Sequence, residues 1–333
     1  CSARLFVTDE FAAPPVILRV DDSVIGTLGN FSASTGKAKS KKTFNVCAIV
    51  AAAMTGGTVL NYSASLPPER RRILYVDTEQ SRFHCKRVLC RILRLAGLPT
   101  DVHPPLLEFL CLRGYATKER LRKIEEAIYD LDDLGLVVID GIRDLAHDIN
   151  SPGEATDLIT KLMQWTDERR IHIHTVLHLN KGDDNTRGHL GTELNNKAET
   201  VLQITKDDFD RDISSVAAMH IRDRDLEPFA FRINADALPE QVEDYQLRQT
   251  TAAKSFDYAE VCEAKHREAL ELLFSKADRV SYSSLIGRLQ SSYAAIGHSF
   301  GINKAKQLKV FLENKRMIVK EDKFYRYNPD FHY

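Results

Sequence analysis

The sequence lacks several features that would assign it to a special class of protein. Its longest apolar run, Val46–Met54, is too short to span a bilayer. Its six cysteines include no Cys-x-x-Cys pair and are too scattered for a disulfide scaffold. The amino end has no charged-then-apolar signal pattern. We therefore expect a cytoplasmic protein with reduced thiols and no membrane partner.

The chain also lacks an excess of charge of one sign. Lys and Arg number 46 and Asp and Glu number 47, a formal net charge of -1, which excludes a uniformly basic surface for nucleic acids. The balance is uneven along the chain, because residues 251–333 contain 14 Lys and Arg against 10 Asp and Glu. A local basic patch in this carboxyl-terminal part is therefore compatible with the composition.

The first part of the chain, residues 1–236, alternates short β-branched runs with helical patterns. This alternation predicts an α/β fold in which helices flank a mainly parallel sheet. Two apolar runs, 73–76 and 136–139, are typical of buried strands. A pair of β-type runs within residues 16–28 surrounds Asp21-Asp22-Ser23 and predicts a hairpin.

The second part of the chain has a different organisation. Residues 237–257 are rich in Pro, Glu, Gln and Thr, and we interpret them as a linker. Residues 258–333 then show three helical segments, 261–274, 282–291 and 303–314, followed by a two-stranded hairpin. Three helices and a hairpin of this size are typical of a small winged helix-turn-helix domain.

A candidate phosphate-binding loop lies between a predicted strand and a predicted helix. It fits the pattern G-x-x-x-x-G-K-[ST] except that Lys41 replaces the second Gly, and it consists of Gly36, Lys37, Ala38, Lys39, Ser40, Lys41, Lys42 and Thr43. Backbone N–H groups of such a loop face phosphates. Lys42 would reach the β- and γ-phosphates, and the Thr43 hydroxyl would bind Mg²⁺.

This stretch of sequence has two other interpretations. A frame that uses Gly36-Lys37 as the second Gly and Lys fails twice, because Phe31 replaces the first Gly and Ala38 replaces the hydroxyl residue. A basic surface turn that contains Lys-Lys-Thr by chance remains open.

Acidic residues follow two of the predicted buried strands. Asp140 ends the run Leu136–Ile139, which places its carboxylate at the edge of the sheet where it can hold Mg²⁺ with Thr43. Glu79 follows the run 73–76 and can accept the proton of an attacking water. A helix-capping role is the alternative for Glu79.

The order of these features resembles the RecA-type ATPase core. A phosphate loop is followed by a strand ending in Asp77-Thr78-Glu79, a strand ending in Asp140, and a strand followed by a Gly-containing loop. The resemblance covers about residues 16–233 and is to replicative ring helicases and plasmid RepA-type ATPases, including relatives on bacterial mobile elements. It implies ATP and Mg²⁺ as ligands, DNA as partner and a homo-oligomer, with a ring as one possible form.

The resemblance also implies roles for residues near the end of the core. His178 or Asn180 would sense the γ-phosphate. Arg222 and Arg224 resemble the pair that helicases insert into the neighbouring subunit's ATP site, and we expect them to alternate along one short strand and share a face. The alternative is a surface pair bonded to nearby carboxylates.

Candidate DNA contacts lie in two places. In the polar loop 181–190, Lys181 and Arg187 could contact single-stranded DNA in a channel, as the resemblance implies, although a solvated surface loop is nearly as good an interpretation. In the winged helix, which could contact duplex DNA or pack on protein, the third helix and hairpin present basic residues that we expect to point outward: Lys304, Lys306, Lys309, Lys315, Arg316 and Lys323.

These observations lead to two hypotheses of different classes. The first is an ATP-hydrolysing, helicase-like motor that acts on DNA during replication or transfer of a plasmid or mobile element. The second is a non-motor DNA-binding protein or regulator, in which the altered phosphate loop is a nucleotide switch or is inactive.

Overall fold

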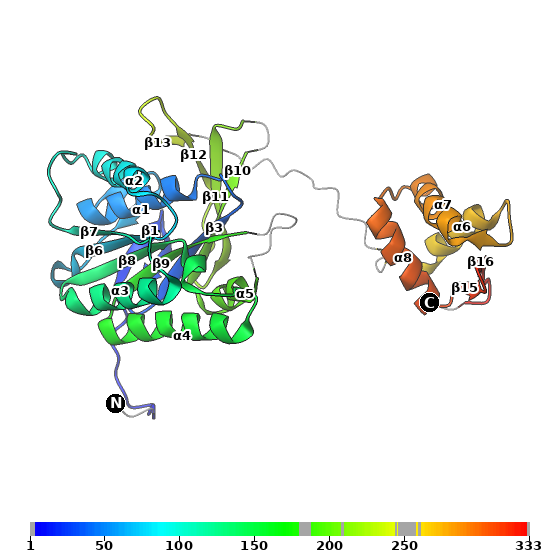
Figure 1. The fold of residues 1–333 in the computed structure, drawn as a ribbon, viewed down its shortest axis with the longest axis horizontal. Coiled ribbons are helices and arrows are strands. Elements are labelled where there is room, and N and C mark those ends of the chain that lie inside the picture. Colours follow the sequence, from blue (N-terminus) through cyan, green and yellow to red (C-terminus); the bar gives the residue numbers. More distant parts are fainter. Residues whose placement is uncertain are drawn as a thin grey trace. The chain divides into compact units, whose positions relative to one another are not determined.

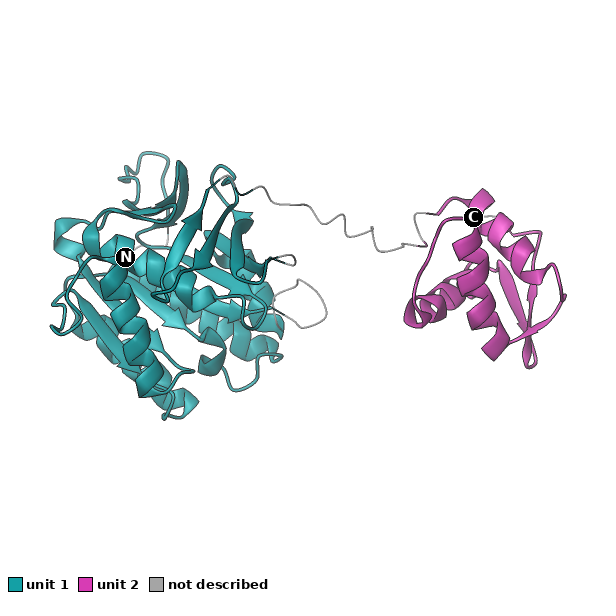
Figure 2. Ribbon diagram, turned by 90° about the horizontal axis from the view of Figure 1, so that it is seen from above, with its two compact units in different colours: residues 1–247 teal, residues 248–333 magenta. Residues whose placement is uncertain are grey.

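The computed structural model describes residues 4–179, 188–207, 210–243, 245, 258 and 261–331. The chain forms two compact units, residues 1–247 and residues 248–333 (Figure 2). Among the described residues, no helix combines the length and the apolar character needed to cross a membrane.

A nine-stranded sheet forms the centre of the first unit. Its order is β13-β12-β11-β10-β3-β9-β8-β6-β7, parallel from β10 to β7 and antiparallel from β10 to β13. In chain order the strands are β3 (Phe31–Gly36), β6 (Arg72–Asp77), β7 (Leu107–Cys111), β8 (Leu134–Asp140), β9 (His172–His178), β10 (Thr200–Lys206), β11 (Ile213–Ile221), β12 (Phe229–Ile233) and β13 (Pro239–Val242).

Helices flank this sheet (Figure 1), and the sheet separates the core into two apolar clusters. One cluster includes α1 (Lys42–Thr55) and α2 (Arg82–Leu95), and the other includes α3 (Thr117–Asp130), α4 (Pro152–Arg169) and α5 (Gly188–Lys197). Two short 3₁₀ turns lie in the connecting segments: η1 (Pro68–Arg70) before β6 and η2 (Ile142–Leu145) after β8. The predicted α/β class with a mainly parallel, helix-flanked sheet is confirmed.

Central strands are buried on both faces, which explains their continuous apolar sequence. All seven residues of β8 are buried. On β9, the imidazoles of His172 and His174 are buried as well, and Ser32 Oγ lies 2.7 Å from His172 Nε2 and 2.8 Å from His174 Nδ1. Burial lowers the pKa of His174 to about 3, so this ring is neutral and part of the core.

A second sheet of four short strands packs beside α1. Its order is β2-β1-β5-β4, formed by β1 (Val16–Val20), β2 (Ser23–Thr27), β4 (Thr58–Val59) and β5 (Tyr62–Ala64). The antiparallel pairing of β1 with β2 is the hairpin expected within residues 16–28.

The stretch expected to be linker, 237–257, begins instead with a strand. β13 is the outermost strand of the large sheet, and Pro239 pairs with Ile233 of β12. A proline is tolerated at the start of an edge strand because no further strand needs its missing N–H. The sheet therefore continues past residue 236, and the interpretation of 239–242 as linker is wrong.

The described residues of the second unit form three helices and a three-stranded sheet. The helices are α6 (Glu263–Phe274), α7 (Tyr282–Ala295) and α8 (Ile302–Asn314), and the strand order is β14 (Val280–Ser281), β16 (Phe324–Tyr327), β15 (Ile318–Glu321). Its own apolar core includes Leu270, Leu285, Tyr293 and Leu308, each fully buried. The short strand β14 was not expected from the sequence, since two residues give no periodicity.

Candidate nucleotide-binding site

The predicted phosphate loop connects β3 to α1 and packs closely against β10. At its start, a Cβ on Gly36 would lie 2.4 Å from the Ile204 carbonyl oxygen and 2.5 Å from Ser40 Oγ. Such distances leave no room for a side chain, so glycine is required at position 36. Ser40 is buried, and its hydroxyl has no hydrogen-bond partner within the described residues.

Lys41, the residue that departs from the motif, occupies a backbone conformation that favours glycine. Its φ is 68° and its ψ is 28°, and its carbonyl accepts hydrogen bonds from the N–H groups of Phe44 and Asn45. The left-handed conformation costs about 1–2 kcal/mol for an L-residue. The Lys41 ammonium leaves the loop and donates to the carbonyls of Asp212, at 2.6 Å, and Arg211, at 3.3 Å.

Lys42 is the first residue of α1, and its side chain lies inside the loop. Its Nζ donates to the carbonyls of Gly36, at 2.8 Å, and Lys37, at 2.9 Å. Desolvation lowers the pKa of this ammonium to about 8, while Asp140 and Glu79 act in the opposite direction. A buried cation held by loop carbonyls is suited to bind an anion in exchange for them.

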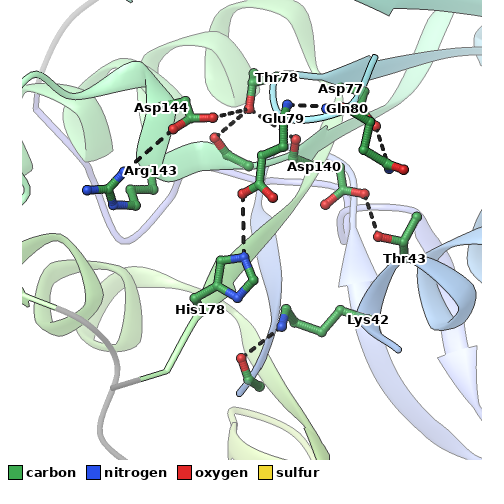
Figure 3. Close-up of polar contacts among 12 residues, drawn as sticks. Lys42, Thr43, Asp77, Thr78, Glu79, Gln80, Asp140, Arg143, Asp144 and His178 are labelled. Carbon is green, nitrogen blue, oxygen red and sulfur yellow. Dashed lines mark hydrogen bonds and ion pairs between the residues drawn. The ribbon is translucent and has the colours of Figure 1, made fainter. Parts of the chain in front are cut away.

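Thr43 and Asp140 meet although 97 positions separate them in the sequence. The Thr43 hydroxyl donates to Asp140 Oδ2 at 3.0 Å (Figure 3). The Tyr75 hydroxyl donates to the same oxygen, also at 3.0 Å. Burial, together with the neighbouring Asp77, raises the pKa of Asp140 to about 6. Hydroxyl and carboxylate oxygens are ligands suited to Mg²⁺, and a cation would relieve the crowding of these acids.

Glu79 lies at the carboxyl end of β6 and faces His178 at the end of β9. Glu79 Oε1 is 3.5 Å from His178 Nε2, and this contact holds the pKa of Glu79 below its usual value. The helix-capping alternative for Glu79 does not match the structure, because α2 begins at Arg82 and Ser81 is its N-cap residue. The turn before the helix is held by Asp77 Oδ1, which accepts the N–H groups of Glu79, at 3.0 Å, and Gln80, at 2.7 Å. The Glu79 side chain is directed toward His178 (Figure 3).

Hydrogen bonds of Thr78 that we did not predict join the ends of β6 and β8. The Thr78 hydroxyl lies 2.9 Å from the Gly141 carbonyl and 3.1 Å from Asp144 Oδ2. Gly141 has a φ of 107°, and a Cβ there would lie 2.1 Å from Thr78 Oγ1. The Asp-Gly pair after an apolar strand was the signal in the sequence that could have identified this tight connection.

A cavity of about 360 Å³ lies between the phosphate loop and the carboxyl ends of β6, β8 and β9. Arg87 and Arg91 of α2 also line it, and Arg91 lies 3.7 Å above the centre of the Phe44 ring. We did not assign either arginine to the site, although their spacing of four positions places both on one helix face. The other lining residues are Lys39, Ser40, Lys41, Lys42, Thr43, Glu79, Gln80, His84, Val88, Asp140, Val176 and His178.

The predicted arginine pair lies elsewhere and is not on a strand. β11 ends at Ile221, and Arg222 and Arg224 lie on the bend that follows, so the expected alternation along one strand is wrong. The bend forms because Asp223 Oδ2 accepts the N–H of Val24 of β2, at 3.0 Å. Both arginines are exposed.

This bend is at the sheet edge opposite the phosphate loop. Ile221 pairs with Thr200, at the amino end of β10, whereas the loop follows the carboxyl end of the parallel strand β3. The two arginines are therefore not part of the cavity of their own chain. Asn180, Lys181 and Arg187 lie outside the described residues.

The basic residues of the second unit differ in their surroundings. Lys306, Lys315, Arg316 and Lys323 are exposed, as expected. Lys304 lies 5.0 Å above the Tyr258 ring. Lys309, which we expected to point outward, forms an ion pair with Glu313, and its side chain is only 14% exposed. The prediction for Lys309 is therefore wrong, because its ammonium lies 5.1 Å above the Tyr325 ring of β16.

Comparisons with known proteins agree with this site. A family model described as an AAA domain matches residues 5–184, more than half of the chain. The chain belongs to this AAA-domain family. The predicted ATPase-type, nucleotide-binding core is thus confirmed at the level of the family.

Solved structures and curated proteins give less information about this chain than the family model does. The chain is similar to the crystal structure of the RadB recombinase, with 16% identity and a TM-score of 0.46 over 65% of this chain and 92% of that one. No curated protein matches the chain.

Proposed function

We propose that this AAA-domain protein binds and hydrolyses Mg-ATP in the cavity beside Lys42, as a RecA-like motor that acts on DNA. The observation that carries the proposal is the hydrogen bond between Thr43 and Asp140 at the mouth of the loop that holds Lys42. A hydroxyl at the start of α1 and a carboxylate at the end of β8 form the two-part site that a phosphate-bound Mg²⁺ needs.

The residues around the phosphate loop would have separate roles in binding Mg-ATP. Lys42 would exchange its contacts with the Gly36 and Lys37 carbonyls for phosphate oxygens. Thr43 and Asp140 would hold Mg²⁺, which neutralises phosphate charge when bound. Gly36 keeps the backbone close to β10, so that the N–H groups of the loop can face the phosphates.

Hydrolysis would depend on residues from the neighbouring strand ends. The Glu79 carboxylate, ionised because its pKa is lowered, would accept the proton of the attacking water. His178, beside it, would contact the γ-phosphate side of the cavity. Arg222 and Arg224 would complete the site of an adjacent copy in a homo-oligomeric ring, because they lie at the edge opposite their own loop.

The DNA contacts that we propose lie mainly in the second unit. We interpret that unit as a winged helix in which α8 enters a groove and the β15–β16 turn lies along the backbone. The side chains that we propose for these contacts are exposed: Lys306, Lys315, Arg316 and Lys323. Lys181 and Arg187 remain predictions from the sequence, as does a role in replication or transfer of a plasmid or mobile element.

The test is Mg-ATP binding and turnover, each with and without single-stranded DNA. Unmutated protein should hydrolyse ATP faster with DNA. Lys42→Ala should lose Mg-ATP binding, whereas Lys37→Ala, a matched loss of positive charge in the same loop, should only weaken it. Equal binding by the Lys42→Ala and unmutated proteins would overturn the assignment of the loop.

A second function, a nucleotide-dependent switch without turnover, is favoured by one observation. Lys41 replaces the motif's second glycine, and the neighbouring Lys42 is bound to carbonyls of its own loop. A switch would bind Mg-ATP without releasing phosphate, and Glu79→Gln would then leave its behaviour unchanged. Phosphate release that Glu79→Gln abolishes would exclude this function.

A further inference from the structure

The glycine position of the phosphate loop is occupied by a lysine whose side chain is bound outside the loop. The Lys41 ammonium lies 2.6 Å from the carbonyl oxygen of Asp212, in the turn that precedes β11. A second contact, 3.3 Å to the Arg211 carbonyl, comes from the same turn. These acceptors are backbone atoms, so the contact depends on the path of the chain and not on the side chains at 211 and 212.

The loop therefore meets the β10–β11 hairpin at two points. At its first residue, Gly36 packs directly against the Ile204 carbonyl of β10. At its last residue before α1, Lys41 reaches over to the turn after that strand. Between these points Ser40 is buried, and the side chain of Lys42, the residue after Lys41, reaches back to the Gly36 carbonyl.

The surroundings explain why a lysine ammonium is retained there. The carboxylates of Asp210 and Asp212 favour its charged form, while partial burial and Lys206 disfavour it and lower its pKa. The ammonium is thus held by two backbone carbonyls of the turn, in a place where nearby carboxylates favour its charge.

We propose that Lys41 is a positioning residue, which holds the phosphate loop in its binding conformation by tying the start of α1 to the turn before β11. The left-handed backbone that glycine adopts freely is here stabilised by the ammonium contacts. This inference rests on the proposed function, because the loop is taken to bind Mg-ATP.

The test compares three variants by hydrogen exchange and by equilibrium binding of Mg-ATP. Lys41→Met keeps the length of the stem and the left-handed backbone but removes the ammonium. Lys41→Gly removes both the tie and the strain. Lys39→Met is the matched control, since Lys39 is also left-handed, with a φ of 64°, and also loses one charge from the loop.

Amide exchange in residues 210–213 should become faster in both Lys41 variants and stay unchanged in Lys39→Met. Mg-ATP binding should weaken about tenfold in Lys41→Met, as expected for loss of a charged hydrogen bond that opposes backbone strain. The affinity of Lys41→Gly for Mg-ATP should fall by about threefold or less, because glycine adopts the left-handed backbone without strain. The affinity of Lys39→Met should also fall less than that of Lys41→Met, because this variant loses only a positive charge from the loop.

Two results would overturn the role of Lys41. One is unchanged exchange at 210–213 in Lys41→Met; the other is an equal loss of Mg-ATP binding in Lys41→Met and Lys39→Met. If unmutated protein binds no Mg-ATP, the proposed function fails, and the exchange experiment alone still decides whether Lys41 fixes the loop to the turn. Exchange within β8, far from the tie in the sheet order, reports whether each variant is folded.

Discussion

The carboxylate of Glu79 and the imidazole of His178 lie 3.5 Å apart and connect the ends of two strands that are not neighbours. β8 lies between β6 and β9 in the sheet, so the pair spans the strand end that carries Asp140. Glu79 is thereby held over the proposed Mg²⁺ ligands, in the position from which a base could act on a water at the γ-phosphate.

The first prediction concerns this carboxylate. Glu79→Gln should bind Mg-ATP nearly as well as unmutated protein but lose turnover by about a hundredfold or more, because a general base is removed while the loop is intact. Binding titration and single-turnover phosphate release measure the two effects. Glu69→Gln, an exposed carboxylate on η1, is the control and should alter neither. Comparable turnover in the Glu79→Gln and unmutated proteins would refute the role as a base.

The second prediction is a pH window for Mg-ATP binding. Asp140, with a pKa of about 6, must be ionised to hold Mg²⁺, so affinity should rise with pH through about 6. Lys42, with a pKa of about 8, must be charged to bind phosphate, so affinity should fall again above about 8. Affinity measured from pH 5 to pH 9 checks both limbs.

ATP itself contributes to the lower limb of that window, since a terminal phosphate also titrates near pH 6. The control is Asp140→Asn protein, in which any remaining limb near pH 6 belongs to the nucleotide. Identical profiles for the Asp140→Asn and unmutated proteins would show that Asp140 does not titrate with binding.

The third prediction is a gain of stability from loss of a site residue. A folded-state pKa of about 6 against 3.8 means that ionised Asp140 destabilises the fold above pH 6, by about 3 kcal/mol at most. Asp140→Asn keeps an acceptor for Tyr75 and Thr43 and should raise the free energy of unfolding at pH 8 by about 1–3 kcal/mol.

Because the penalty exists only while the unfolded chain ionises more readily than the folded one, this gain should shrink as the pH falls from 6 to 4. Urea unfolding without nucleotide, at pH 8 and pH 4, measures it. A variant less stable than unmutated protein at pH 8, or a gain independent of pH, would contradict the argument.

The fourth prediction tests the arginines at the far edge. Arg224→Ala should lack turnover alone, yet regain some when mixed with Lys42→Ala protein, because some mixed interfaces pair an intact loop with an intact arginine. Arg232→Ala, an exposed arginine on β12, should keep its turnover and serves as control. A mixture that stays inactive despite proven co-assembly, or turnover by a strict monomer, would remove Arg224 from the mechanism.

The fifth prediction separates two lysines of α8. Lys306→Ala should weaken binding of duplex DNA severalfold and reduce the salt dependence by about one ion, because Lys306 is exposed. Lys309→Ala should change DNA binding little and lower stability instead, because Lys309 pairs with Glu313 and packs on Tyr325. Salt titrations of binding and thermal unfolding of both variants decide between these outcomes. Equal effects of the two variants on DNA binding would mean that the exposure of a lysine side chain does not determine whether it contacts DNA.

Most of the candidate site could be predicted because parallel strands end at one edge. Thr43, Glu79 and Asp140 are brought together by that rule alone, although the residues lie far apart in the sequence. The bend at Arg222 could not be predicted, since it depends on a hydrogen bond between Asp223 and Val24, 199 positions away. The start of the linker was misjudged because β13 is short and polar, and only its pairing with β12 defines it.

β11 runs antiparallel to β10, and this separates the arginines at 222 and 224 from the cavity of the same chain. Nine residues at about 3.4 Å each carry the chain from the turn beside Lys41 to the bend at Arg222, across the depth of the sheet. A contact between one copy's cavity and another copy's arginines would therefore join two different patches. If copies repeat head to tail through this contact, the interface is heterologous, and its rotation angle decides whether they close into a ring or extend as a helical filament.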